Sequence, residues 1–182
     1  MIFIALGANL EHPRWGSPRA TCTAALAALA APDLVPTRRS RWYESAPVPA
    51  SDQPWYVNGI AELSTDLDPA RLLARLHGVE ADFGRVRGAV NATRVLDLDL
   101  IAFDERVSAP GVVPILPHPR MHERLFVLLP LAELAQAWRH PRLGVGLSEL
   151  IAAMPADRAT IRPFPGDPPQ SLASPERAAY IR

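Results

Sequence analysis

The stretch Arg94-Val95-Leu96-Asp97-Leu98-Asp99-Leu100-Ile101 decides the fold that we expect, because leucine and aspartate alternate along it. Alternation with a period of two residues predicts a β-strand. The three leucines then face one side of the strand and the two aspartates face the other. Side chains two residues apart project side by side, about 6.5–7 Å apart along the strand. The stretch therefore presents a pair of neighbouring carboxylates.

Two carboxylates on a closed apolar face would cost several kcal/mol, or their pKa values would shift until both were neutral. On an open face with arginines nearby they form a site for hard divalent cations such as Mg²⁺, which prefer oxygen ligands. A solvated edge strand explains the Asp-x-Asp pattern equally well when the pattern is taken alone. The residues around the stretch favour the cation site.

The chain has 182 residues, enough for one domain with its own core. Its 19 basic and 19 acidic residues give zero net charge, which argues against nucleic acid or an anionic membrane as partner. The single cysteine, Cys22, excludes an intramolecular disulfide and suits a reducing compartment. The first residues, Met1 to Gly7, lack the basic segment of a signal peptide, and no apolar run could span a bilayer. We therefore expect a soluble, cytoplasmic protein.

Apolar periodicity predicts six elements before residue 102. They are a strand over 2–6, a helix over 17–31, strands over 35–44 and 56–64, a helix over 68–84 and the strand over 94–101. Ser17-Pro18 and Asp68-Pro69 supply an N-cap and a first turn for the two helices. The 35–44 strand is polar and is expected to be exposed, and the prolines between residues 45 and 54 exclude a helix there.

This order of elements predicts an α+β fold with a ferredoxin-like βαββαβ core. We expect an antiparallel sheet with the helices on one face and the active site on the other. Asp97, Asp99, Tyr56 and Asn58 would then gather on the uncovered face. Glu80 lies on or beside the apolar stripe of the 68–84 helix, so it is either a rim residue or a ligand contact.

The rest of the chain is rich in proline, of which the sequence has 20 in all. A helix is predicted over 121–134, restarted at Pro130, and a shorter one over 147–154. From Pro155 onward the composition leaves little to bury. We therefore expect one domain over residues 1–155 and a proline-rich, loosely packed tail over 156–182.

Short motifs in a fixed order suggest a family. In chain order they are Gly7-Ala8-Asn9-Leu10, Pro47, Asp52-Gln53-Pro54 with Tyr56 and Asn58, Glu80, Gly84-Arg85-Val86-Arg87, Arg94 with Asp97-Leu98-Asp99-Leu100-Ile101, Pro117-His118, and Arg124 with Phe126 and Pro130-Leu131. By these motifs the chain resembles the 6-hydroxymethyl-7,8-dihydropterin pyrophosphokinases of folate synthesis. The resemblance covers roughly residues 1–150.

The resemblance implies transfer of the β,γ-diphosphate of ATP to the hydroxymethyl oxygen of the reduced pterin, with release of AMP. Asp97 and Asp99 match the family's ligands for Mg²⁺, of which two ions are expected. Positions that would hold the triphosphate match Arg85, Arg87 and Arg94. The residues that match the family's catalytic positions are Arg85, Arg94, Asp97 and Asp99. The residues that match further ATP contacts of the family are Gln53, Glu80, Leu100, His118 and Arg124.

The resemblance also implies a pterin site. Tyr56 and Phe126 would sandwich the flat ring system, and Asn58 would meet its amide edge. The segment that would supply backbone partners to the remaining ring edge is Ser45, Ala46, Pro47 and Val48. The loop with Asp52 and Gln53 would close over ATP and exclude water.

The sequence departs from the family before the aspartate strand, where Val90-Asn91-Ala92-Thr93 lacks an aromatic residue and an arginine that many members carry. We therefore expect weaker ATP binding but retained activity. Two other classes stay open from the residues. A non-catalytic small-molecule-binding module would not need two aspartates with three arginines, and a metal-dependent nuclease would need a basic stripe. We expect a monomer that binds no nucleic acid.

Overall fold

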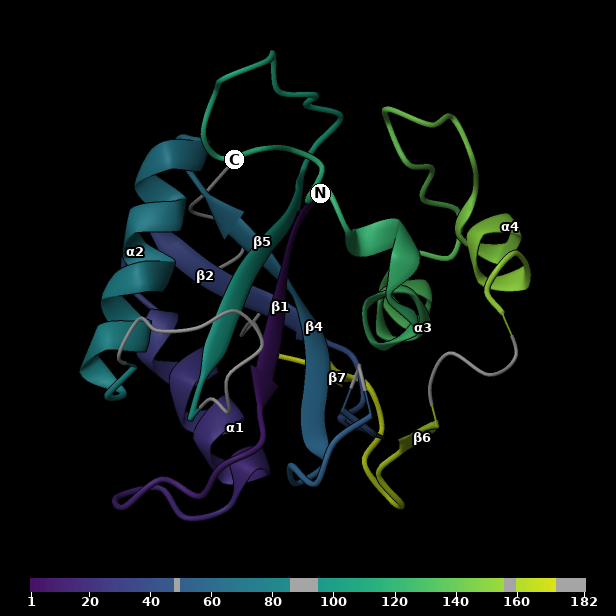
Figure 1. Ribbon diagram of the computed structural model, residues 1–182. Coiled ribbons are helices and arrows are strands. Elements are labelled where there is room, and N and C mark those ends of the chain that lie inside the picture. Colours follow the sequence, from purple (N-terminus) through teal and green to yellow (C-terminus); the bar gives the residue numbers. More distant parts are fainter. Residues whose placement is uncertain (48–49, 86–94, 156–159, 173–182) are drawn as a thin grey trace.

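Four long antiparallel strands form the centre of the computed structural model, which describes residues 1–47, 50–85, 95–155 and 160–172 (Figure 1). They are β1 (Ile2–Ala8), β2 (Leu34–Arg39), β4 (Tyr56–Thr65) and β5 (Asp97–Phe103). Their order in the sheet is β5-β1-β4-β2, so the first and last of them in the sequence are neighbours. The short strand β3 (Tyr43–Ser45) also pairs with β4. The predicted antiparallel sheet of an α+β fold is confirmed.

Helices α1 (Pro18–Leu29) and α2 (Pro69–Asp82) cover one face of this sheet (Figure 1). Both begin as predicted: the Ser17 hydroxyl accepts a hydrogen bond from the Ala20 N–H, and the Asp68 carboxylate accepts one from the Arg71 N–H. The leucine side of the 94–101 stretch packs beneath these two helices. Its members, Leu96, Leu98 and Leu100, belong to one buried cluster with Leu72 and Leu76 of α2.

The second face is partly covered. The 3₁₀ helix η1 (Met121–Glu123) leads into α3 (Leu125–Leu134), and α4 (Leu147–Ala152) follows. Val127, Leu128 and Leu131 of α3 form a second buried cluster with sheet residues that include Phe3 and Ile60. The prediction that one face carries no helices is therefore wrong for the part of the sheet beneath α3. Among the described helices, none combines the length and the apolar character needed to cross a membrane.

The connection between β2 and β3 is buried, although its sequence predicted an exposed strand. Trp42 is 1 % exposed and Ser40 is fully buried. The Trp42 ring lies over Gly59 of β4, where a Cβ atom would come within 2.6 Å of the ring. A glycine in the interior of a strand often marks such a close approach. The polar residues of this segment are buried because they pair with each other and with the C-terminal segment.

This close approach makes a stability prediction. Gly59→Ala is expected to lower the free energy of unfolding by about 1–3 kcal/mol, because the indole must move in a packed core. Urea unfolding of the variant measures the change. Gly78→Ala is the control, since a Cβ atom at that helical position meets nothing within 4 Å. Equal stability of the two variants would contradict the prediction.

The described part of the C-terminal segment, residues 160–172, pairs with the sheet, although its strand residues are mostly exposed. Strand β6 (Ile161–Pro163) pairs with β3, and β7 (Gln170–Ser171) pairs with β2. Between them, Asp167 is 3 % exposed. Residues 160–172 bury little apolar surface of their own and are held by backbone pairing and one buried carboxylate. The loosely packed tail over 156–182 stays a prediction.

Candidate active site

Asp97 and Asp99 open β5, beside the end of β1. In the register of these strands Asp97 lies opposite Gly7, and Asp99 lies opposite Ala5. Both aspartates are half-buried and alternate with the buried Leu98 and Leu100. They therefore face away from α1 and α2, as the alternation in the sequence predicts.

Arg85 joins the end of α2 to this strand. Its Nη1 atom lies 2.5 Å from Asp97 Oδ1 and also contacts Glu80 Oε1. Burial disfavours charge on this guanidinium, but Asp97 and Glu80 outweigh it and raise the pKa of Arg85. Arg85 is thus a permanent cation that is fixed between two carboxylates.

Glu80 is not a rim residue, which corrects the first of the two predictions for its place on α2. A contact of Glu80 with ATP stays a prediction. Glu80 is 2 % exposed, and its Oε1 atom accepts a hydrogen bond from the Leu98 N–H at 2.7 Å. Burial raises the pKa of its carboxyl group, while the Leu98 N–H and Arg85 oppose that shift. Glu80 therefore ties α2 to β5 and orients Arg85.

Asp99 has its own cationic neighbours. Arg124 Nη1 lies 3.6 Å from Asp99 Oδ2, and His118 Nε2 lies 3.9 Å from the same oxygen. Burial and the charge of Asp97 raise the pKa of Asp99, against the influence of His118 and Arg124. Burial also lowers the pKa of His118, whose Nδ1 atom accepts the Arg120 N–H at 3.2 Å. The neutral imidazole then carries its proton on Nε2 and can donate it to a ligand.

The donor set fits a hard divalent cation. Two carboxylates face the same side of one strand, and carboxylate oxygen is the ligand that Mg²⁺ prefers. Burial and the charge of Asp97 both raise the pKa of Asp99, and a cation bound at this site would offset that repulsion. Within the described part of the chain no cluster of three or more His, Cys, Asp or Glu residues could hold a metal. Further ligands would come from phosphate and water, which Mg²⁺ commonly keeps.

A second group of polar residues lies on β3 and β4. Asn58 Nδ2 donates to Ser45 Oγ at 2.8 Å, and both residues are buried. The Asn58 Oδ1 atom lies over Gly7, where an added Cβ would come within 3.3 Å of it. Gly7 of β1 pairs with Asn58 of β4 on one side and with Asp97 of β5 on the other. Gly7 therefore separates the Asn58–Ser45 pair from the two aspartates.

Tyr56 and the preceding loop are tied together. The Tyr56 hydroxyl donates to Gln53 Oε1 at 3.0 Å, and Asn9 Nδ2 donates to the same oxygen at 3.3 Å. Asn9 also donates to the Pro54 carbonyl and is 2 % exposed. In the sequence, Asn9 stood out only as part of the motif Gly7-Ala8-Asn9-Leu10. The motif gave no sign that Asn9 contacts Gln53. Asn9 therefore joins the site residues as the support of the Gln53 loop.

The remaining expected residues are placed as follows. Phe126, half-buried at the start of α3, lies 5.6 Å from the Arg124 guanidinium. The Leu100 side chain lies in the helix-covered core, so only its backbone could meet a ligand. Ala46 and Pro47 follow β3 directly. Residues that lie outside the described part of the chain are Val48, Arg87, Arg94 and the departure at Val90-Asn91-Ala92-Thr93.

Comparisons with known proteins point to one family. A model of the family described as 7,8-dihydro-6-hydroxymethylpterin-pyrophosphokinase matches residues 3–136. A 2-amino-4-hydroxy-6-hydroxymethyldihydropteridine pyrophosphokinase of Pseudomonas aeruginosa is 40 % identical over 158 residues, which are 85 % of this chain and 91 % of that protein. A protein of the same name from Haemophilus influenzae is 38 % identical over 133 residues, 73 % of this chain and 80 % of that protein.

Proposed function

The chain belongs to the 7,8-dihydro-6-hydroxymethylpterin-pyrophosphokinase family, and we propose that Asp97, Asp99 and Arg85 carry the family's reaction. The chain transfers the diphosphate of ATP to the hydroxymethyl group of 6-hydroxymethyl-7,8-dihydropterin, giving AMP and the pterin diphosphate for folate biosynthesis. The observation that supports the site is the pair of aspartates on one face, with Arg85 on the first and Arg124 and His118 near the second. A non-catalytic binding module is not favoured, since the similar proteins are named as pyrophosphokinases.

We also assign the core to the ferredoxin-like class. The support is the strand order β5-β1-β4-β2 together with α1 after β1 and α2 after β4. In this arrangement the ends of β1, β4 and β5 that carry Gly7, Asn58 and Asp97 lie side by side in the sheet. The class thus explains why residues distant in the sequence meet at one place.

On the phosphate side, the chain's work is positioning and charge neutralisation, because phosphoryl transfer requires little covalent chemistry from the protein. Asp97 and Asp99 hold Mg²⁺, two ions in our proposal, and the metal supplies neutralisation of the triphosphate. Arg85 donates N–H groups to phosphate oxygens in the fork geometry that guanidinium provides. Arg124 and the Nε2–H of His118 act at the Asp99 end of the same site. Arg87 and Arg94 are proposed to add further phosphate contacts.

The reaction itself is an in-line substitution at the β-phosphorus. The hydroxymethyl oxygen forms the new bond, and the bond from the β-phosphorus to the oxygen of the leaving AMP breaks. The pterin hydroxyl loses its proton to solvent, and AMP leaves as an anion. Exclusion of other water from the site falls to the loop with Asp52 and Gln53, which Asn9 supports in this structure.

On the pterin side, we propose that Asn58 recognises the amide edge of the ring, since its side chain offers both a donor and an acceptor. Its bond to Ser45 Oγ fixes the amide orientation. Backbone groups of Ser45, Ala46, Pro47 and Val48 serve the remaining edge, and Tyr56 and Phe126 stack on the two ring faces. The Gln53 contact holds the Tyr56 ring.

Tyr56→Ala tests the pterin assignment. The dissociation constant for the pterin is expected to rise about 5- to 150-fold, because stacking of a flat ring on an aromatic side chain contributes about 1–3 kcal/mol. The dissociation constant for ATP should not change. Tyr56→Phe, which keeps the ring and loses the bond to Gln53, is the control and should bind pterin nearly as well as the parent chain. Equal losses in both variants would assign the effect to the hydroxyl and not to stacking.

The product of the nucleotide tests the function as a whole. Chromatography of ATP, Mg²⁺ and pterin incubated with the chain should show AMP, and only when the pterin is present. ADP would indicate a simple kinase, and the absence of any nucleotide product would indicate a binding module.

We further propose that the chain acts as a monomer, because one chain supplies every proposed site residue. We also propose a cytoplasmic location, because the free, buried thiol of Cys22 suits a reducing compartment.

A further inference from the structure

The C-terminal segment 160–172 lies beyond residues 3–136, which the family model matches, and packs on the edge of the sheet that carries Ser45. In the pairing of β3 with β6, Ser45 lies opposite Ile161. The next backbone group, the Ala46 N–H, donates to the Thr160 carbonyl at 3.1 Å. The strand proposed to serve the pterin edge is therefore itself held by the C-terminal segment.

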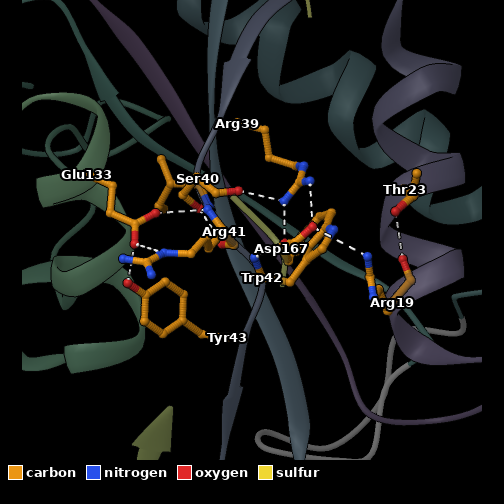
Figure 2. Close-up of polar contacts among 10 residues, drawn as sticks. Arg19, Thr23, Arg39, Ser40, Arg41, Trp42, Tyr43, Glu133 and Asp167 are labelled. Atoms are coloured by element: carbon orange, nitrogen blue, oxygen red, sulfur yellow. Dashed lines mark hydrogen bonds and ion pairs between the residues drawn. The ribbon is translucent and has the colours of Figure 1, made fainter. Parts of the chain in front are cut away.

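Asp167 anchors this segment to the sheet. Its carboxylate accepts two hydrogen bonds from Arg39, at 3.0 and 3.1 Å, and one from the Trp42 N–H at 2.7 Å (Figure 2). Arg19 of α1 reaches it at 3.4 Å. Burial alone would raise the pKa of Asp167, but Arg39 and the Trp42 N–H lower it below its ordinary value. The carboxylate is thus ionised and its bonds to the β2–β3 connection persist near neutral pH.

Glu133 of α3 holds the same connection from its other side. Its carboxylate accepts the Arg41 N–H at 2.9 Å, the Arg41 Nε–H at 2.6 Å and the Tyr43 hydroxyl at 2.5 Å (Figure 2). Figure 2 shows Glu133 and Asp167 on opposite sides of the connection between Ser40 and Trp42. Since β3 begins at Tyr43, two carboxylates from distant segments fix where β3 lies.

Arg162 of β6 contacts Glu44 and Trp55, the residues that precede Ser45 and Tyr56. Its Nε atom donates to Glu44 Oε2 at 2.8 Å. Its guanidinium carbon also lies 5.0 Å from the centre of the Trp55 ring, and Trp55 precedes Tyr56. One side chain of the C-terminal segment therefore links β3, which carries Ser45, to the start of β4, which carries Tyr56.

We propose that residues 160–172 form part of the pterin site by holding β3, whose Ser45 pairs with Tyr56 of β4, in place from its other side. Arg162 and Asp167 are positioning residues in this role and do not touch the substrate. The proposal rests on the function proposed above and assigns to the C-terminal segment a share in recognising the pterin but none in binding ATP.

Arg162→Ala is the first test, because this side chain is 65 % exposed and its loss leaves the core intact. The KM and the dissociation constant for the pterin are expected to rise about three- to fivefold, given the usual strength of an exposed ion pair and cation–π contact. The KM for ATP, kcat and the melting temperature should match those of Arg75→Ala. Arg75→Ala is the matched control, since it removes an exposed pair with Asp33. Arg162→Lys should recover part of the loss.

Asp167→Asn is the second test and acts through the backbone of the β2–β3 connection. It should raise the pterin KM more than the ATP KM and also lower the melting temperature. An unchanged pterin KM in Arg162→Ala, or equal rises for pterin and ATP in both variants, would overturn the proposal. Absence of AMP formation by the parent chain would instead overturn the proposed function, so the two failures are distinguishable.

Discussion

Asp97→Ala is expected to lower the rate of AMP formation by about 10³-fold or more while the pterin binds with nearly unchanged affinity. Neutralisation of a transferring phosphoryl group by bound metal contributes several kcal/mol to the transition state, and Asp97 is one of two carboxylates that face this site. The pterin contacts that we propose lie on β3 and the residues after it, on β4 and on α3, and none of them depends on the Asp97 side chain. The variant thus separates chemistry from substrate recognition.

The measurement is steady-state AMP formation together with titration of the pterin into each protein. Asp33→Ala is the matched control, because it removes a partly exposed carboxylate that pairs with an arginine away from the site. It should retain the parent rate. A rate of Asp97→Ala within about tenfold of the parent would remove Asp97 from the metal site that we propose, since tenfold corresponds to only 1.4 kcal/mol.

Arg85→Ala is expected to have the second largest effect, on both rate and stability. Loss of a guanidinium that neutralises phosphate charge should lower the rate by about 10²–10³-fold. The substitution also leaves Glu80 buried without its cation, and removing one partner of a buried pair costs about 3–5 kcal/mol. The variant should therefore melt several degrees below the parent chain.

A double variant separates these two effects. In Arg85→Ala with Glu80→Gln the buried group is neutral and can still accept the Leu98 N–H through its amide oxygen. The melting temperature should recover most of the loss, while the rate stays low. Recovery of the rate together with stability would show that Arg85 acts only through the fold and would contradict its role at phosphate.

The fold could be predicted in the segments where local patterns decide the structure. The alternation of leucine and aspartate places Asp97 and Asp99 on the face away from α1 and α2, and burial follows that alternation. Ser17 and Asp68 cap their helices because a cap depends on residues only three positions away. Interactions between residues close together in the sequence were enough to predict these elements.

Long-range contacts account for what the sequence did not reveal. The burial of Trp42 requires Gly59 beneath its ring, and the packing of residues 160–172 requires Asp167 to meet Arg39, which lies 128 positions earlier. From the sequence Glu80 is either a rim residue or a ligand contact, and only the contacts with Leu98 and Arg85 show that it is enclosed. No periodicity marks such partners, although a glycine within a strand could have indicated a close approach.

The most direct measurement is the phosphorus-31 NMR spectrum of ATP, Mg²⁺ and 6-hydroxymethyl-7,8-dihydropterin incubated with the chain. The account predicts that the ATP resonances give way to one resonance of AMP and two coupled resonances of the pterin diphosphate. A parallel sample with Asp97→Ala should keep its ATP over the same time. Resonances of ADP, or the pterin diphosphate formed equally fast by Asp97→Ala, would contradict the account.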